Sequence, residues 1–164
     1  MIRIRPMEER DFPFILRINE ENVSVLAPMD EAGLRRFGAM AECFLLAELD
    51  GEAAGFLIAL REGCEGYESE NYRWFSRHYP RFLYIDRVVI DAPFRGQGIG
   101  RTLYKRVFDR ATETRVPFVT AEVDTVPYNA ESLAFHAAMG FHEVGTQSVR
   151  GGSVTVSLLE AAVE

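Results

Sequence analysis

The residue types and spacing best suited to chemistry occur in one glycine-rich turn, Arg95-Gly96-Gln97-Gly98-Ile99-Gly100-Arg101. An apolar run at 83–90 precedes the turn and predicts a buried strand, which Pro93 ends because proline has no N–H for the ladder. Apolar residues at helical spacing follow from 99 to 111. The first amides of a helix lack intrahelical partners, and glycines let an anion approach them closely. The stretch therefore predicts a phosphate-binding turn between a strand and a helix.

The type of phosphate ligand is restricted by what the turn lacks. Its spacing differs from the dinucleotide fingerprint G-x-G-x-x-G, and the Lys-Ser/Thr pair of a P-loop is absent. Arg95 and Arg101 flank the glycines and suit an anionic ligand, whereas Lys105 and Arg106 are read as a solvated helix face. The alternative is an ordinary strand-to-helix turn whose glycines only cap and pack.

The remaining periodicities predict the elements that position this turn. They indicate a strand at 2–5, helices at 11–21 and 30–42, a hairpin of 43–49 and 53–60 around Asp50-Gly51, a short helix at 70–77 within the loop 61–81, a strand at 117–123, a helix from Asn129 to Gly140, and strands at 142–147 and 153–159. Asp11 can cap the first helix. This order predicts an α/β protein with a mixed sheet and helices on both faces, and the 164 residues suit one domain over 1–164.

Composition argues against several classes of function. A net charge of −7 is a poor basis for binding nucleic acid through its phosphates. No apolar run approaches the roughly 20 residues of a membrane helix, and the N-terminus lacks a signal-peptide core. Cys43 and Cys64 match no metal or disulfide spacing, so we expect no metal site, reduced thiols and a cytoplasmic protein.

Two motifs carry a resemblance to a known family. Arg95-x-x-Gly98-x-Gly100, with aliphatic residues just upstream, resembles the coenzyme A signature of the GNAT superfamily of N-acetyltransferases. The family's second motif, Asn-x-x-Ala/Ser followed by Tyr-x-x-x-Gly-Phe, is similar to the segment from Asn129 to Phe141. With the element order, the resemblance covers nearly the whole chain. Residues 71–75, 84–87, 121–123 and 135–136 are similar to those of a poorly characterised bacterial subgroup.

The resemblance implies a fold of the GNAT type and acetyl-CoA (coenzyme A) as acetyl donor. The turn would hold the pyrophosphate, and the backbone of the preceding strand would pair with the pantetheine arm. The implied cofactor-binding residues are Val88, Val89, Ile90, Arg95, Gly96, Gln97, Gly98, Ile99, Gly100, Arg101, Asn129, Ser132 and His136. For Asn129 the alternative is a plain helix N-cap.

Catalytic candidates also follow from the resemblance. Family members commonly place an acidic tyrosine four residues before the glycine of Gly-Phe, and here that position is His136. A histidinium can donate a proton to the leaving thiolate, whereas a neutral imidazole can only orient it, and a packed histidine is the alternative. Asp86 and Glu122 lie in mostly apolar strands, where carboxylates are costly unless paired or useful, so each is either a base or an ion-pair partner.

The acceptor is expected to be a primary amine of a small, cationic or amino-acid-like molecule. Expected acceptor-site residues are Tyr72, Trp74, Tyr84, Glu20 and Asn22, although such aromatics also serve as ordinary packing. The predicted reaction is direct attack of the amine in a ternary complex. The alternative is a non-catalytic acyl-CoA-binding sensor or partner module. The resemblance also allows a homodimer, because final strands in this family often pair across subunits.

Overall fold

The structure, a computed structural model, describes residues 1–164. Its strands are β1 (Ile2–Pro6), β2 (Cys43–Leu49), β3 (Glu52–Arg61), β4 (Leu83–Ile90), β5 (Phe118–Val126), β6 (His142–Val149) and β7 (Val154–Ala162). Its α-helices are α1 (Phe12–Glu20), α2 (Glu31–Met40), α3 (Glu70–His78), α4 (Ile99–Glu113) and α5 (Ala130–Ala138). Each predicted element is present, in the predicted order.

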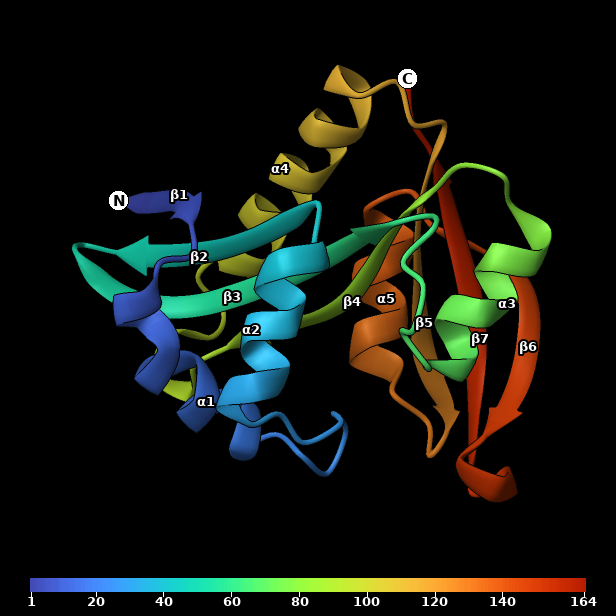
Figure 1. The fold of residues 1–164 in the computed structure, drawn as a ribbon, viewed down its shortest axis with the longest axis horizontal. Coiled ribbons are helices and arrows are strands. Elements are labelled where there is room, and N and C mark those ends of the chain that lie inside the picture. The colour runs from blue at the N-terminus through green and yellow to red at the C-terminus, as the bar shows by residue number, and fades with distance from the viewer. The chain divides into compact units, whose positions relative to one another are not determined.

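The strands form one seven-stranded sheet in the order β1-β2-β3-β4-β5-β7-β6 (Figure 1). β4 and β5 pair in parallel, while β2 pairs antiparallel with β1 and β3, and β7 with β5 and β6. The predicted mixed sheet is therefore confirmed. By its internal contacts the chain divides into two compact units, unit 1 of Met1–Leu60 and Ile85–Arg110, and unit 2 of Arg61–Tyr84 and Ala111–Glu164. A single domain over 1–164 stays a prediction.

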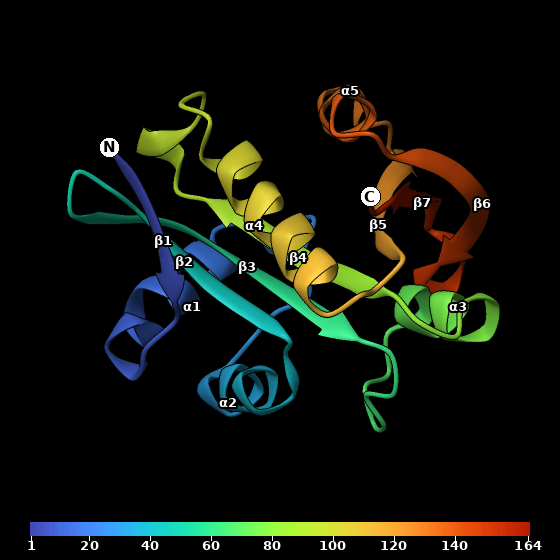
Figure 2. The ribbon, with the colours of Figure 1, turned by 90° about the horizontal axis from the view of Figure 1, so that it is seen from above.

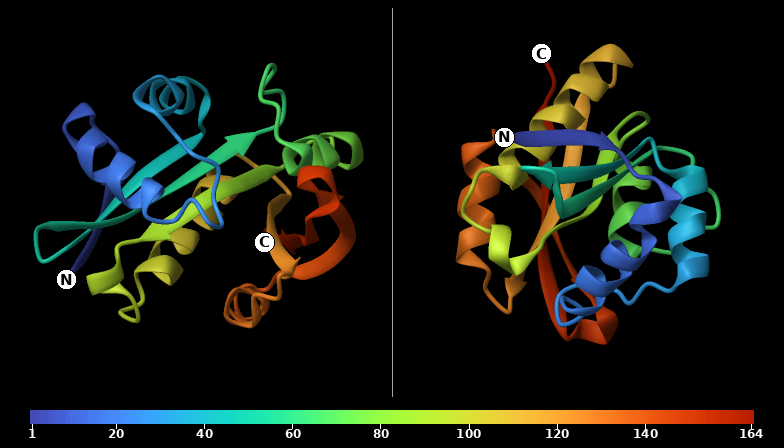
Figure 3. Two further views of the ribbon diagram at one scale, coloured as in Figure 1. Left: turned by 90° about the horizontal axis from the view of Figure 1, so that it is seen from below. Right: turned by 90° about the vertical axis from the view of Figure 1, so that its left-hand side faces the viewer.

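Unit 1 is a sheet region covered on both faces. α1 and α2 lie on one face of β1 to β3, and α4 lies on the other (Figures 2 and 3). Every residue from Ala54 to Leu60 is buried. A strand covered on both faces has no polar side, which is why this run is continuously apolar rather than alternating. Ile15 and Ile18 of α1, and Leu103 of α4, are fully buried and complete the core.

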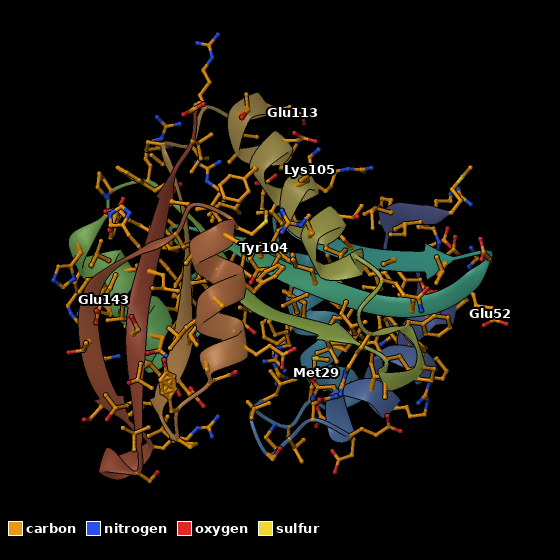
Figure 4. All side chains as sticks on the ribbon, turned by 180° about the vertical axis from the view of Figure 1, so that it is seen from behind. Met29, Glu52, Tyr104, Lys105, Glu113 and Glu143 are labelled. Atoms are coloured by element: carbon orange, nitrogen blue, oxygen red, sulfur yellow. The ribbon has the colours of Figure 1, made fainter.

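Unit 2 carries α3 and α5 on opposite faces of β5, β7 and β6, with α5 nearer the viewer in Figure 4. Under α3 lies an aromatic cluster in which Tyr72 packs edge-on against Phe82 and Tyr84, with ring centroids 5.6 Å apart in both pairs. The indole of Trp74 lies against Gly145, where an added Cβ would be 2.6 Å from its ring. Gly145 stands at a register shift of β6, so the bulge and the missing side chain together admit the indole.

The sequence-based boundaries agree with the structure least well at the carboxyl end of the chain. β5 extends to Val126 and β7 to Ala162, three residues beyond the predicted ends in each case. These two strands pair with each other over almost their full length, so each is prolonged by its partner rather than by its own composition. None of the helices is both long and apolar enough to cross a bilayer.

Candidate active site

The predicted phosphate turn has the expected backbone in unit 1. β4 ends as Asp91 donates its N–H to the Ala54 carbonyl at 2.8 Å, and a single 3₁₀ turn of residues 92–94 follows. Gly96 and Gly98 adopt φ of +78° and +82°, which favour glycine. The N–H of Thr102 donates to the Gly98 carbonyl at 3.1 Å and opens the helical bonding of α4. The amides of 99–101 therefore precede the first intrahelical donor, the Thr102 N–H, and form the anion-binding end of the helix.

Two arginines flank these amides. Arg95 is exposed and donates from Nε to the Ile90 carbonyl at 3.3 Å and from Nη2 to Asn22 Oδ1 at 3.4 Å. Arg101 is exposed in the first turn of α4. An added Cβ at Gly96 or Gly98 would meet no atom within 4 Å, so the glycines serve backbone conformation rather than packing. Amides that precede the first helical hydrogen bond, a helix start and two exposed guanidinium groups form a donor set suited to a phosphate anion.

The backbone of β4 upstream of the turn lies directly against β3 at Gly55. A Cβ built on Gly55 would be 2.6 Å from the Val89 carbonyl oxygen and 3.3 Å from Ile90 Cα. Val89 is buried, whereas Val88 and Ile90 are partly exposed. Gly55 thus fixes the segment that was predicted to pair with the pantetheine arm. Gly55 is not among the residues predicted from the sequence, although an isolated glycine in a strand marks a close backbone approach.

Asp86 forms the ion pair that was its structural alternative. Its Oδ2 lies 2.7 Å from Arg87 Nε, and the two side chains are only 4% and 6% exposed. Arg87 also donates from Nη1 to Asn19 Oδ1 at 2.9 Å, so the pair joins β4 to α1 within unit 1. A base role for Asp86 stays a prediction. In that role its carboxylate would have to take up a proton while it is paired with the Arg87 guanidinium.

Glu122 lies in unit 2 within a chain of hydrogen bonds. Its Oε1 accepts the Tyr84 hydroxyl at 2.7 Å and the Asn71 Nδ2 at 3.1 Å. Asn71 Oδ1 accepts Gln147 Nε2 at 3.1 Å. Among the predicted site residues, Tyr84 and Glu122 are thereby in direct contact. The sequence does not indicate Gln147 and places Asn71 only within the subgroup segment, because an isolated polar residue on a helix or strand carries no signal for such a contact.

His136 is buried on α5, with the Ser132 carbonyl 2.8 Å from its Nδ1. A carbonyl oxygen only accepts, so Nδ1 carries the hydrogen in this contact. Burial lowers the pKa of His136 below its usual 6.5, and the hydrogen bond to Ser132 opposes this only in part. Near neutral pH the ring is therefore neutral, with Nε2 as an acceptor. This tautomer suits the orienting role better than the proton-donating one.

The other residues of α5 serve the helix ends. Asn129 Oδ1 accepts the Ser132 N–H at 3.2 Å, so the N-cap alternative is observed. At the other end Gly140 has φ +96° and the Phe141 N–H returns to the His136 carbonyl at 3.0 Å. The Asn129 cap and His136 therefore lie at the two ends of a helix of nine residues.

The predicted acceptor-site residues have mostly packing contacts. The Tyr72 hydroxyl donates to the Arg61 carbonyl at 2.6 Å and accepts the Cys64 N–H at 3.0 Å, and burial raises the pKa of Tyr72 to about 12. Trp74 stacks on His78 with ring centroids 3.8 Å apart. These contacts favour the packing alternative for both aromatics.

The two acceptor-site residues predicted in unit 1 lie at the end of α1. Glu20 is exposed in its last turn. Asn22 donates to the Ile18 carbonyl at 2.7 Å and accepts from Arg95. Unit 1 thus holds these two residues together with Asp86, the β4 segment and the glycine turn, while the remaining predicted site residues belong to unit 2.

Comparisons with known proteins place this geometry in a family. The sequence model described as the acetyltransferase (GNAT) family matches residues 3–141. Structurally, the chain is similar to a ribosomal-protein-alanine N-acetyltransferase from Brucella melitensis (26% identity, TM-score 0.69, covering 98% of this chain and 99% of that one).

Two further solved structures are similar in fold. Arabidopsis thaliana Naa50, in complex with the bisubstrate analogue CoA-Ac-MVNAL, has 17% identity and a TM-score of 0.74, covering 97% of each chain. A putative phosphinothricin N-acetyltransferase has 19% identity and a TM-score of 0.73, covering 100% of this chain and 99% of that one. No functionally curated protein matches by sequence. With the family model spanning most of its length, and the strand, glycine turn and helix in place, the chain belongs to the GNAT family of acetyltransferases.

Proposed function

We propose that this protein transfers the acetyl group of acetyl-CoA to a primary amine, by direct attack of the amine in a ternary complex. Family membership makes acetyl-CoA the donor, since the thioester is the acetyl source of these enzymes. The observation that carries the proposal is the turn at 95–101, with two glycines at positive φ and unbonded amides at the start of α4. This donor set fits a diphosphate.

Each predicted donor-binding residue has a proposed task. The amides of 96–101, with Arg95 and Arg101, hold the pyrophosphate of acetyl-CoA. The β4 backbone at 88–90 holds the pantetheine arm, and Gly55 supports that backbone from behind. Asn129 and Ser132 contribute polar atoms at the start of α5.

Glu122 is the proposed base. The ammonium first loses one proton to solvent. During transfer the neutral amine nitrogen then bonds the carbonyl carbon, the carbon–sulfur bond breaks to release coenzyme A as a thiolate that solvent protonates, and the nitrogen loses its second proton. Glu122 accepts that second proton, since hydrogen bonds from Tyr84 and Asn71 favour its ionised, proton-accepting form, whereas Asp86 is held by Arg87. His136, neutral by burial, orients the sulfur side of the reaction rather than supplying its proton.

The proposed acceptor carries a cationic amine. The Glu122 carboxylate attracts the positive charge of an ammonium, which gives one proton to solvent before the neutral amine attacks. The similar solved structures include proteins named for a ribosomal-protein alanine and for phosphinothricin, so both peptide N-termini and small amino-acid-like amines belong in a test.

The decisive assay measures free thiol released from acetyl-CoA with phosphinothricin, a peptide beginning with alanine, and spermidine. We expect thiol release that depends on one of these amines and falls at least about 100-fold in Glu122→Gln, the lower end of what a general base contributes. Saturable acetyl-CoA binding without amine-dependent release would instead support the non-catalytic binding module. Thr146→Val, an exposed change on β6, is the matched control.

A further inference from the structure

We propose that Asn71 and Gln147 are positioning residues that fix the side chain of Glu122 on β5 as a hydrogen-bond acceptor. This role rests on the proposed function of Glu122 as the base. Neither residue touches the reacting atoms in this scheme. Asn71 acts on Glu122 directly, and Gln147 acts on it only through Asn71.

The direction of the hydrogen bonds carries the inference. An ionised carboxylate has no proton to donate, so the Asn71 carboxamide must turn its NH₂ group towards Glu122 Oε1. Its oxygen then faces Gln147, which must in turn supply its own NH₂ group, at 3.1 Å. With the Tyr84 hydroxyl donating to the same oxygen, donors point from β6 through α3 to β5 and end on the carboxylate.

This arrangement does more than fill space. Hydrogen bonds donated to a carboxylate stabilise its charged form, so these contacts keep Glu122 ionised and able to accept a proton. An Asn71 side chain without Gln147 can rotate its amide by half a turn and present oxygen to oxygen. Gln147 removes that freedom, although it comes from a strand 76 residues away from Asn71 in sequence.

Other titratable groups share the face of Glu122 and are the same in every variant below. They include Asp124 of β5, and Tyr84 of β4 and Glu160 of β7, which both align with Thr120. Glu70 of α3 accepts the Arg150 N–H after β6. Burial raises the pKa of Asp124, and the charge of Arg150 opposes that effect. Because these groups are common to wild type and variants, differences in the Glu122 pKa report on the hydrogen bonds from Gln147 through Asn71 to Glu122, here called the relay.

The test measures the pKa of Glu122 in the full chain by carbon-13 NMR of its carboxyl carbon. Asn71→Leu removes one donor to the charged form, and we expect the Glu122 pKa to rise by about one unit. Gln147→Glu should raise it too, because a carboxylate at 147 draws the Asn71 NH₂ group away. Thr146→Val, on the opposite face of β6, should leave it unchanged.

A double-mutant cycle separates the relay from simple charge repulsion. We expect Gln147→Glu to shift the Glu122 pKa clearly less when Asn71→Leu is already present. An equal shift in both backgrounds, or no shift in Asn71→Leu, would overturn the inference. If Asn71→Leu fails to fold, the Glu122 pKa is compared between Gln147→Glu and Gln147→Leu. We expect a larger rise in Gln147→Glu, since only the charged substitution draws the Asn71 NH₂ group away, and equal values would overturn the inference.

Activity provides a separate readout. With the amine that gives the highest rate in the panel, the acid limb of kcat/KM should move upward with the NMR pKa in Asn71→Leu. An NMR shift with an unmoved acid limb supports the relay and refutes Glu122 as the base. The two failures are therefore distinguishable, because the NMR measurement needs no turnover.

Discussion

Replacing Gly55 with alanine tests how closely β4 is held against β3. In an unobstructed strand this change is stabilising by about 0.5–1 kcal/mol, because glycine loses more backbone freedom on folding. Here the new Cβ would lie 2.6 Å from the Val89 carbonyl oxygen, against a normal carbon contact of about 3.5 Å. The neighbouring backbone must retreat by nearly an ångström, and such overpacking costs about 1–3 kcal/mol. We therefore expect Gly55→Ala to lower the free energy of unfolding rather than raise it.

Urea unfolding followed by circular dichroism measures this free energy directly. Gly38→Ala is the matched control, because its Cβ would meet only the flexible end of Met7 at 3.6 Å, within helix α2. We expect Gly38→Ala to gain up to about 1 kcal/mol while Gly55→Ala loses stability and binds acetyl-CoA more weakly. A Gly55→Ala protein as stable as Gly38→Ala would refute the close approach.

Three further predictions concern buried ionisable groups. Asp11→Ala should cost about 3 kcal/mol in urea unfolding, because it leaves the buried Arg5 without the carboxylate that it contacts at 2.8 Å, and a loss below about 1 kcal/mol would contradict a buried pair. Burial alone raises the pKa of Asp11, but the hydrogen bond and charge of Arg5 outweigh burial and lower that pKa. The stability from this pair is therefore present above the unfolded pKa of 3.8 and is lost as the pH falls through the folded pKa. This part of the pH dependence of stability should be absent in Asp11→Ala. Because burial lowers the pKa of His136, the unfolded chain takes up a proton first as the pH falls. Wild type should therefore lose more stability than His136→Phe just below pH 6.5, and identical pH dependence would refute a buried neutral ring. Asp86→Asn should lower the unfolding free energy, because it removes the ion pair to Arg87. Its amine-dependent turnover should stay above that of Glu122→Gln, and the reverse ranking of activities would make Asp86 the base.

Features set by neighbouring residues were predictable. Strand, glycine turn and helix follow from local periodicity and backbone freedom, and the structure has positive φ at Gly96, Gly98 and Gly140, where helix starts and ends were expected. Asp11 shows the limit of local reasoning. It precedes α1 as a cap should, but its carboxylate makes no cap bond and instead accepts from Arg5 and from the Glu8 N–H. A local pattern permits both uses, and only the packed structure decides between them.

Features that depend on distant segments could not be predicted. The contact between Gln147 and Asn71 joins a strand and a helix that are remote in sequence, and neither residue departs from ordinary surface composition. The same holds for Asp86 and Glu122, which were equivalent candidates from sequence. Their environments differ because Arg87 forms an ion pair with Asp86, while Tyr84 and Asn71 donate hydrogen bonds to Glu122.

The central claim is that main-chain amides of the turn at 95–101 bind the diphosphate of acetyl-CoA. Gln97→Glu tests it while leaving Gly96 and Gly98 in place, since Gln97 is exposed between them. Calorimetry should show acetyl-CoA affinity falling about tenfold, as expected for a negative charge some 6 Å from a doubly charged diphosphate in water, with Gln97→Asn as the neutral control. S-acetylpantetheine, which lacks the diphosphate, should bind wild type and Gln97→Glu alike. Unchanged acetyl-CoA affinity in Gln97→Glu, or an equal loss for both ligands, would contradict the account.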